Sequence, residues 1–153
     1  GNSTPLSDGA SVVLLASEEW AAEHDLPVLA WFVDHETAAV DYVNGHGTAT
    51  EQGDIAETLA TSSLFGEHMP ISSQKSFLGH TLGACGALES WFSIEMLNRD
   101  RYVHTFNLDE VDPECGRLDY LRNEFRSMSN EYMMNNNFAF GGVNTSLIFK
   151  RWN

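Results

Sequence analysis

Short apolar runs rich in β-branched residues alternate along this chain with longer segments that have helical spacing. The runs that predict strands are residues 11–16, 28–33, 40–44, 71–73, 132–140 and 143–149. The predicted helices are a short one from the N-cap Ser17 to about Asp25, one over 54–65 after a turn at 51–53, and one over 82–97. Residues 34–39 form a polar link, and 98–126 are irregular apart from a short strand at 118–121. This alternation predicts an α/β fold with helices layered on both faces of a mixed sheet.

The last two predicted strands flank Gly141-Gly142. Two adjacent glycines between strands favour a tight turn, so the sheet should end in an antiparallel pair. The remaining strands alternate with helices and are expected to be mainly parallel. At 153 residues, the chain is expected to form a single domain over 1–153.

Charge is distributed unevenly along the chain, and the net charge is −14. Residues 1–74 contain 12 acidic and no basic residues, whereas residues 75–153 contain 10 acidic and 8 basic residues. An acidic protein is a poor partner for nucleic acid or an anionic membrane surface. There is no apolar run of the ~18 residues that a membrane span needs, and no signal peptide is visible. We therefore expect a cytoplasmic protein with no nucleic-acid partner and no membrane span.

Only two cysteines are present, Cys85 and Cys115. They do not form a disulfide framework or a CxxC pair, so a reducing compartment is the default and no metal site is expected. Cys85 falls within the helix predicted over 82–97 and is interpreted as a core residue. Cys115 falls in a loop between Pro113 and Gly116. Neither position suggests a reactive nucleophile.

Two histidines have informative neighbours. His46 lies between two glycines directly after a predicted strand, in the sequence N-G-H-G-T-A-T over 44–50. Taken alone, it could be an ordinary turn histidine or an active group at a strand end. His80 precedes the glycine- and alanine-rich start of a helix, in K-S-F-L-G-H-T-L-G-A-C-G over 75–86. The positive end of a helix disfavours imidazolium and favours a neutral ring that can act as donor or base.

These two motifs, followed by N-N-F-A-F-G-G over 136–142, resemble in this order the second half of a β-ketoacyl-[acyl-carrier-protein] synthase. That family consists of thiolase-like condensing enzymes of fatty-acid and polyketide assembly. The resemblance implies a thiolase-like half-fold with α-β-α layers. Features shared with the aryl-polyene type are N-G-H-G-T-A-T, the helix L-G-A-C-G-A-L-E and the ending N-N-N-F-A-F-G-G-V-N-T-S-L-I-F.

The resemblance also implies roles for individual residues. His46 and His80 would be the two catalytic histidines, and Lys75 would belong to the catalytic set. Glu89 would support Lys75 in a charged network behind the histidines. From the residues alone, Lys75 and Glu89 could equally be an ordinary helix-edge ion pair.

Further roles concern the substrate. Thr48 and Thr50 would line the tunnel for a phosphopantetheine arm, and Phe140 would be a gating residue whose backbone N–H is an oxyanion donor beside Gly141. The reaction implied is a decarboxylative Claisen condensation of an acyl thioester with malonyl-carrier protein. No separate cofactor is expected, because phosphopantetheine arrives on the acyl carrier protein.

The chain departs from the family in two ways. It lacks the T-A-C-S-S-type elbow that holds the nucleophilic cysteine, and a family crossover helix is replaced by the short link at 34–39, an apparent deletion. The chain alone should therefore be inactive, and a partner half with the cysteine, or a homodimer partner, is expected. The alternatives are a non-catalytic dimerisation or chain-length-factor-like module, and a thiolase-related acyl-CoA enzyme. The candidate docking residues for a carrier protein are Arg99, Arg101, Arg117, Arg122 and Arg126.

Overall fold

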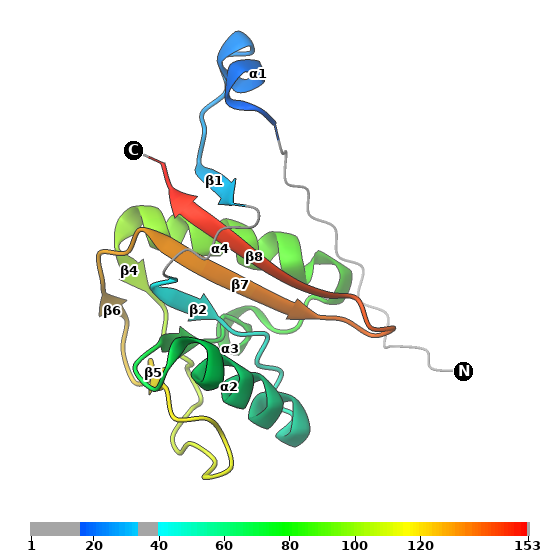
Figure 1. Ribbon diagram of the computed structural model, residues 1–153, viewed down its shortest axis with the longest axis vertical. Helices are drawn as coiled ribbons and strands as arrows, with labels where there is room; N and C mark the ends of the chain where they lie inside the picture. Colours follow the sequence, from blue (N-terminus) through cyan, green and yellow to red (C-terminus); the bar gives the residue numbers. More distant parts are fainter. Residues whose placement is uncertain (1–15, 34–39, 153) are drawn as a thin grey trace.

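A six-stranded mixed sheet forms the centre of the protein. The computed structural model describes residues 16–33 and 40–152 (Figure 1). The strands are β1 (Ala30–Val33), β2 (Tyr42–Asn44), β3 (Pro70–Ser72), β5 (Asp119–Tyr120), β7 (Tyr132–Phe138) and β8 (Asn144–Arg151). Their order in the sheet is β1-β8-β7-β2-β3-β5. β7, β2, β3 and β5 are parallel neighbours, whereas β8 is antiparallel to both β7 and β1. The predicted mixed sheet with a final antiparallel pair is confirmed.

Helices lie on both faces of the sheet, as Figure 1 shows. They are α1 (Glu18–Glu23), α2 (Glu51–Phe65), α3 (Lys75–Leu78), the 3-10 turn η1 (Leu82–Ala84) and α4 (Cys85–Arg99). A small second sheet pairs β4 (Arg101–Tyr102) with β6 (Arg126–Ser127). The architecture is therefore the predicted α-β-α layering.

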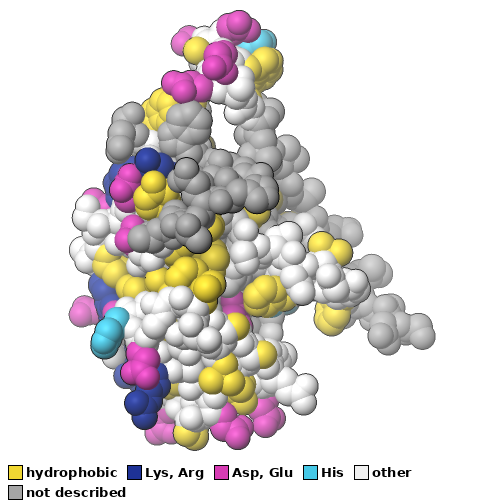
Figure 2. All heavy atoms as spheres, viewed as in Figure 1, with side chains coloured by type: hydrophobic (Ala, Val, Ile, Leu, Met, Phe, Trp, Pro, Cys, Tyr) yellow, Lys and Arg dark blue, Asp and Glu magenta, His cyan; other side chains and the backbone are white. Residues whose placement is uncertain are grey.

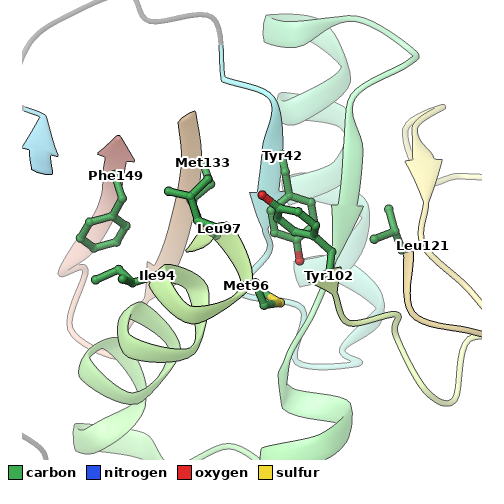
Figure 3. Packing of buried hydrophobic residues seen from close by; sticks show 8 residues of the cluster. All are labelled: Tyr42, Ile94, Met96, Leu97, Tyr102, Leu121, Met133 and Phe149. Atoms are coloured by element: carbon green, nitrogen blue, oxygen red, sulfur yellow. The ribbon is translucent and has the colours of Figure 1, made fainter. Parts of the chain in front are cut away.

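Neighbouring residues of each central strand point into different cores, because side chains alternate across a strand. Tyr42 and Met133 pack with Ile94 and Leu97 of α4 in one core (Figure 3). Val43 and Met134 pack with Ile71 in the other core, against which Phe65 at the end of α2 also packs. The sheet thus has apolar side chains on both faces, as expected of central parallel strands covered by helices.

The helix predicted to start after Ser17 does so, and Ser17 accepts a hydrogen bond from the N–H of Trp20. This helix stands apart from the sheet, and its acidic residues gather at one extremity of the surface (Figure 2). One prediction is wrong: residues 51–53 are the first turn of α2 rather than a separate turn, because Thr50 serves as N-cap and its carbonyl accepts from Asp54 N–H. The elements α3, β4 and β6 were not predicted.

The predictions of a strand over 11–16 and of a link at 34–39 lie, except for Ala16, outside the described residues. Within the described part, no helix is both long and apolar enough to span a membrane.

The loop between β4 and β5 approaches α2 through Gly116. Its N–H donates to Thr58 Oγ1 at 3.0 Å. A Cβ atom at residue 116 would lie 2.2 Å from the carbonyl oxygen of Thr58. The backbone of the loop therefore lies directly against the backbone of the helix, which only glycine permits here.

Candidate active site

His46 is held at the carboxyl end of β2 by a buried acid on α2. Its backbone N–H donates to Glu57 Oε1 at 2.9 Å, and the N–H of Gly47 donates to Glu57 Oε2 at 3.0 Å. Asn136 Nδ2 on β7 donates to Glu57 Oε1 at 3.1 Å. Glu57 is only 7% exposed. The histidine loop is thus fixed by charge-assisted hydrogen bonds to one carboxylate.

His80 lies between α3 and η1, close to His46. The two ring centroids are 5.4 Å apart, and the rings meet edge to face. The N–H of Leu82 donates to His80 Nδ1 at 3.1 Å. In the neutral ring, Nδ1 is therefore the acceptor and Nε2 bears the proton. The structure brings together the two histidines singled out in the sequence, with a donor N–H available on at least one of them.

Both imidazoles are neutral at pH 7. Burial, followed by the positive charge of Lys75 and the neighbouring His80, lowers the pKa of His46 to about 4. Burial and then Lys75 also lower the pKa of His80. Neutral rings can donate a hydrogen bond to a developing oxyanion without first losing a proton, which suits the chemistry expected of them.

Lys75 and Glu89 form a buried ion pair behind the histidines. The distance from Lys75 Nζ to Glu89 Oε1 is 2.7 Å, and the side chains are 5% and 2% exposed. Burial raises the pKa of Glu89, and Lys75 opposes that rise. The alternative of an exposed helix-edge pair is therefore wrong. The pair lies in the interior, where removing one partner leaves a charge without compensation.

Cys85 is buried as predicted, but its surroundings are polar as well as apolar. Its thiol is in hydrogen-bonding contact with both Lys75 and Glu89, and burial raises its pKa. A thiol with a raised pKa is a poor nucleophile, because the thiolate is the reactive form. Cys115 is partly exposed in the loop that covers α2.

A cavity of about 570 Å³ is lined by His80 and by Gly45 and Gly47, the two neighbours of His46, whereas His46 itself is not among the lining residues. Its lining includes His80, Lys75, Thr48, Thr50, Cys115 and Tyr120. The hydroxyls of Thr48 and Thr50 are 3.1 Å apart. The volume is within the range of small-molecule sites in proteins. Both threonines predicted to contact a pantetheine arm thus face the same cavity as His80.

The aromatic residue next to His46 is Phe138 rather than Phe140. The centroid of the Phe138 ring is 5.6 Å from that of His46. Phe140 is 86% exposed at the tip of the β7–β8 hairpin, which Figure 1 shows projecting beyond the helices. Gly141 and Gly142 have φ values of 86° and 81°, as the tight turn requires. The structure therefore brings Phe138, and not Phe140, into contact with the histidines.

Sequence reasoning missed Glu57, Asn136 and Phe138. Asn136 and Phe138 are two residues apart in β7, so their side chains lie on the same face of the strand. Because the sequence predicts this strand, the spacing between the two residues was a signal that could have identified them. Glu57 had no such signal, because the apolar residues Leu59 and Leu64 of the predicted helix are exposed and its buried residues are Glu57, Thr58 and Thr61. Among the described residues, no group of three or more His, Cys, Asp or Glu side chains could hold a metal ion.

The fold and the paired histidines define a thiolase-like condensing-enzyme half. Residues 3–109 match the family model of the beta-ketoacyl synthase, C-terminal domain. The 3-oxoacyl-[acyl-carrier-protein] synthase 1 of Haemophilus influenzae is 36% identical over 148 residues, which cover 96% of this chain and 35% of that protein. The homolog of this synthase in Saccharomyces cerevisiae is 44% identical over 128 residues, covering 76% of this chain and 29% of that protein.

Solved structures agree. A beta-ketoacyl synthase from Burkholderia phymatum has a TM-score of 0.83 and 47% identity, covering 89% of this chain and 41% of that one. A ketosynthase in complex with its chain length factor from Xenorhabdus doucetiae has a TM-score of 0.68 and 36% identity, covering 75% and 29%. This chain belongs to the beta-ketoacyl synthase family and corresponds to its C-terminal half. It spans about a third of the length of the curated relatives named above.

Proposed function

We propose that this chain is the histidine-bearing half of a 3-oxoacyl-[acyl-carrier-protein] synthase and requires a second half with the nucleophilic cysteine. The observation on which this rests is the pair of imidazoles with ring centroids 5.4 Å apart, both with lowered pKa values, next to the cavity. The curated relatives named above are synthases that act, by their names, on acyl carrier protein. This favours a carrier-protein substrate over a thiolase-related use of acyl-CoA.

The proposed reaction begins when the cysteine thiolate of the other half displaces a carrier-protein thiol and takes up its acyl group. Malonyl-carrier protein then enters the cavity with its pantetheine arm beside Thr48 and Thr50. Its bond to the carboxylate breaks, CO₂ leaves, and the electron pair moves to the thioester oxygen as an enolate. His80 donates its Nε2–H to this oxygen, and His46 is the second donor.

The enolate carbon then attacks the acyl-cysteine carbonyl. The resulting tetrahedral oxyanion is stabilised by backbone N–H groups, for which Phe140 is the candidate from this chain. Its collapse expels the cysteine thiolate and releases the 3-oxoacyl thioester on the carrier protein. In this scheme Glu89 does not contact substrate, and Lys75, which lines the cavity, acts through its charge. Their ion pair helps to keep both imidazoles neutral through the charge of Lys75.

The test is complementation. The chain is mixed or co-expressed with a cysteine-bearing N-terminal half of a relative, and condensation and CO₂ release from malonyl-carrier protein are measured. The complemented pair should condense, the chain alone should not, and His46→Ala and His80→Ala should each suppress CO₂ release. Condensation by the chain alone would contradict the need for a second half. Unchanged CO₂ release in both histidine variants would contradict their role.

A second candidate is a non-catalytic module like a chain length factor. Cys85 is buried with a raised pKa and so lacks the features of a nucleophile, and one similar structure is a ketosynthase in complex with its chain length factor. In that case the chain would bind a complete synthase, or a second copy of itself, without contributing catalytic groups. Size-exclusion chromatography with light scattering, with and without a synthase, tests this. Binding that leaves condensation unchanged in His46→Ala would favour the module.

A further inference from the structure

Four buried polar side chains connect the elements that bear the proposed catalytic groups. They are Asn44 on β2, Gln74 before α3, Ser90 on α4 and Asn135 on β7, each at most 2% exposed. We call these four residues the amide network.

Hydrogen bonds join the members of the amide network in sequence. Asn44 Nδ2 donates to Asn135 Oδ1 at 2.7 Å, and Asn135 Nδ2 donates to Ser90 Oγ at 3.2 Å. Asn44 Oδ1 accepts from the backbone N–H of Gln74 at 3.2 Å. The Gln74 side chain donates to Ser93 Oγ at 2.8 Å and to the carbonyl of Glu89 at 3.3 Å. The hydrogen bonds therefore connect β2 and β7 to the start of α3 and to α4.

Each member lies one or two residues from a group of the site. Asn44 precedes His46 by two residues, and Gln74 directly precedes Lys75. Ser90 directly follows Glu89. Asn135 directly precedes Asn136, whose amide binds the carboxylate that holds the His46 loop. A shift of any one member would therefore be transmitted to a different part of the site.

Folding alone gives no reason for amides at these places. Asn44 and Asn135 face each other in the register of two central parallel strands, where apolar residues are the rule. Burial of an amide is unfavourable unless its hydrogen bonds are made. Both side-chain polar atoms of Asn44 and of Asn135 are bonded here, whereas Gln74 is bonded through Nε2 and its Oε1 has no partner. Bonded polar networks make a core more rigid and more specific than an apolar one. Such a network is expected where the separation of nearby groups has to be fixed.

We propose that the amide network is the positioning device of the site: it sets the distance between the two imidazoles and their distance from the Lys75–Glu89 pair. This inference rests on the proposed function for its catalytic meaning. Its four members contact no substrate and act through the residues beside them. They are positioning residues, a role separate from that of the histidines.

The test uses histidine ring NMR on the chain alone. The first variant is Asn135→Leu, which is similar in size and removes two hydrogen bonds of the network. The second is Ser90→Ala, a smaller change that removes one of these bonds. The matched control is Tyr42→Phe on β2, which removes a buried hydroxyl bonded at 2.6 Å to Ser72, outside the network.

Two quantities are measured: the nuclear Overhauser effect between the two rings and the pKa of His46. The titratable groups around that ring are Lys75 from α3 and His80, which both lower its pKa, and Glu57 from α2, which binds the backbone N–H of His46; Glu89 of α4 is paired with Lys75. In Asn135→Leu the effect should weaken at least about threefold, and the pKa should rise by about one unit toward its ordinary value. Loosening the site admits water and increases the distance to Lys75, which produces both changes. Ser90→Ala should give roughly half of each change, and Tyr42→Phe should give neither.

The proposal is overturned if a folded Asn135→Leu keeps both readouts at wild-type values, or if Tyr42→Phe shifts them equally. If Asn135→Leu does not give a dispersed spectrum, the same criteria are applied to Ser90→Ala. These measurements need neither carrier protein nor the cysteine half. Failure of the complementation assay and failure of this inference are therefore separate results.

Discussion

The loops with the two histidines and the tip of the β7–β8 hairpin differ in how many of their side chains pack against the rest of this chain. Around His46, backbone and side chain are fixed by Glu57, by the adjoining His80 ring and by Phe138. At the hairpin tip, Phe140 and Val143 are 86% and 64% exposed. The first region is organised by contacts within the described chain, and the second has apolar side chains directed to solvent.

The difference suggests that the histidine loops are organised within the isolated chain, whereas the hairpin tip is expected to become buried only when a partner binds. Fixed donors around a developing charge need to be organised before the reaction, and the interior of this chain provides that organisation for the histidines. Exposed apolar side chains in a family half are expected to be covered when the other half binds. Substitutions in the two regions should therefore differ in their effect on the isolated chain.

The largest effect is expected from Lys75→Met. It leaves Glu89 buried without its partner, and the free energy of unfolding should fall by about 3–5 kcal/mol. Urea denaturation measures this. The control is Arg99→Met, which removes the exposed pair with Glu95 and should cost about 0.3–0.5 kcal/mol. Equal losses in both variants would mean that the buried pair contributes no more than a surface pair.

The next effect is expected from Glu57→Leu, which removes the acceptor of the N–H groups of His46 and Gly47. The free energy of unfolding should fall by about 2–3 kcal/mol, because these donors lose a charged partner. Glu57→Gln keeps one acceptor oxygen and should lose less. Glu51→Gln, at an exposed position of the same helix, is the control. A stable Glu57→Leu with an unchanged His46 ring signal would contradict the role given to Glu57.

A third effect concerns pH. The pKa of His46 is about 4 in the folded chain, whereas the ordinary value in an unfolded chain is about 6.5. Between these values the unfolded chain binds more protons, so stability should rise with pH over this range and fall as the solution is acidified. Unfolding measured at several pH values should show a smaller slope in His46→Leu. His24→Gln, at the exposed C-cap of α1, controls for the loss of a histidine. The same slope in wild type and His46→Leu would show that His46 is not the source.

The smallest effect is expected at the hairpin. Phe138→Ala removes the ring beside His46 and should cost about 1 kcal/mol, whereas Phe140→Ala should stay within about 0.5 kcal/mol. In the complemented enzyme the order should reverse for the rate if the Phe140 side chain is the gating residue; its backbone N–H, the proposed oxyanion donor, is retained in the alanine variant. Thermal unfolding shows which variant loses more stability, and the condensation rate shows which variant loses more activity. A Phe140→Ala variant as active as wild type after complementation would remove that role.

Much of the fold followed from local patterns. The N-cap Ser17, the periodic helix at 82–97 and the glycine pair at 141–142 predicted elements that the structure confirms. Local patterns could not give α3, β4 and β6, because these elements have at most four residues and owe their form to packing. The turn predicted at 51–53 is wrong, because Thr50 is the N-cap of a helix that includes Gly53.

The two histidines and the two residues of the buried ion pair could be singled out from the sequence, because they lie in sequence motifs. The choice between Phe138 and Phe140 was beyond the sequence, because it depends on where the hairpin turns relative to the sheet. Glu57 was missed because only tertiary structure shows which face of α2 is inward. Cytoplasmic location, a dimer and the roles given to His46, His80, Lys75, Glu89, Thr48, Thr50, Phe140 and Gly141 stay predictions.

The absence of a side chain at Gly116 affects the size of the ligand that the cavity can hold. Cys115 and Thr58, on the two sides of the contact between the loop and α2, both line the cavity beside His80. Any side chain at position 116 would act as a wedge between that loop and the helix. The cavity would then widen, whereas the hydrogen bonds from the His46 loop to Glu57 and the Lys75–Glu89 ion pair would be retained. A substitution at position 116 is therefore expected to change the volume of the cavity through contacts separate from those that hold the histidines.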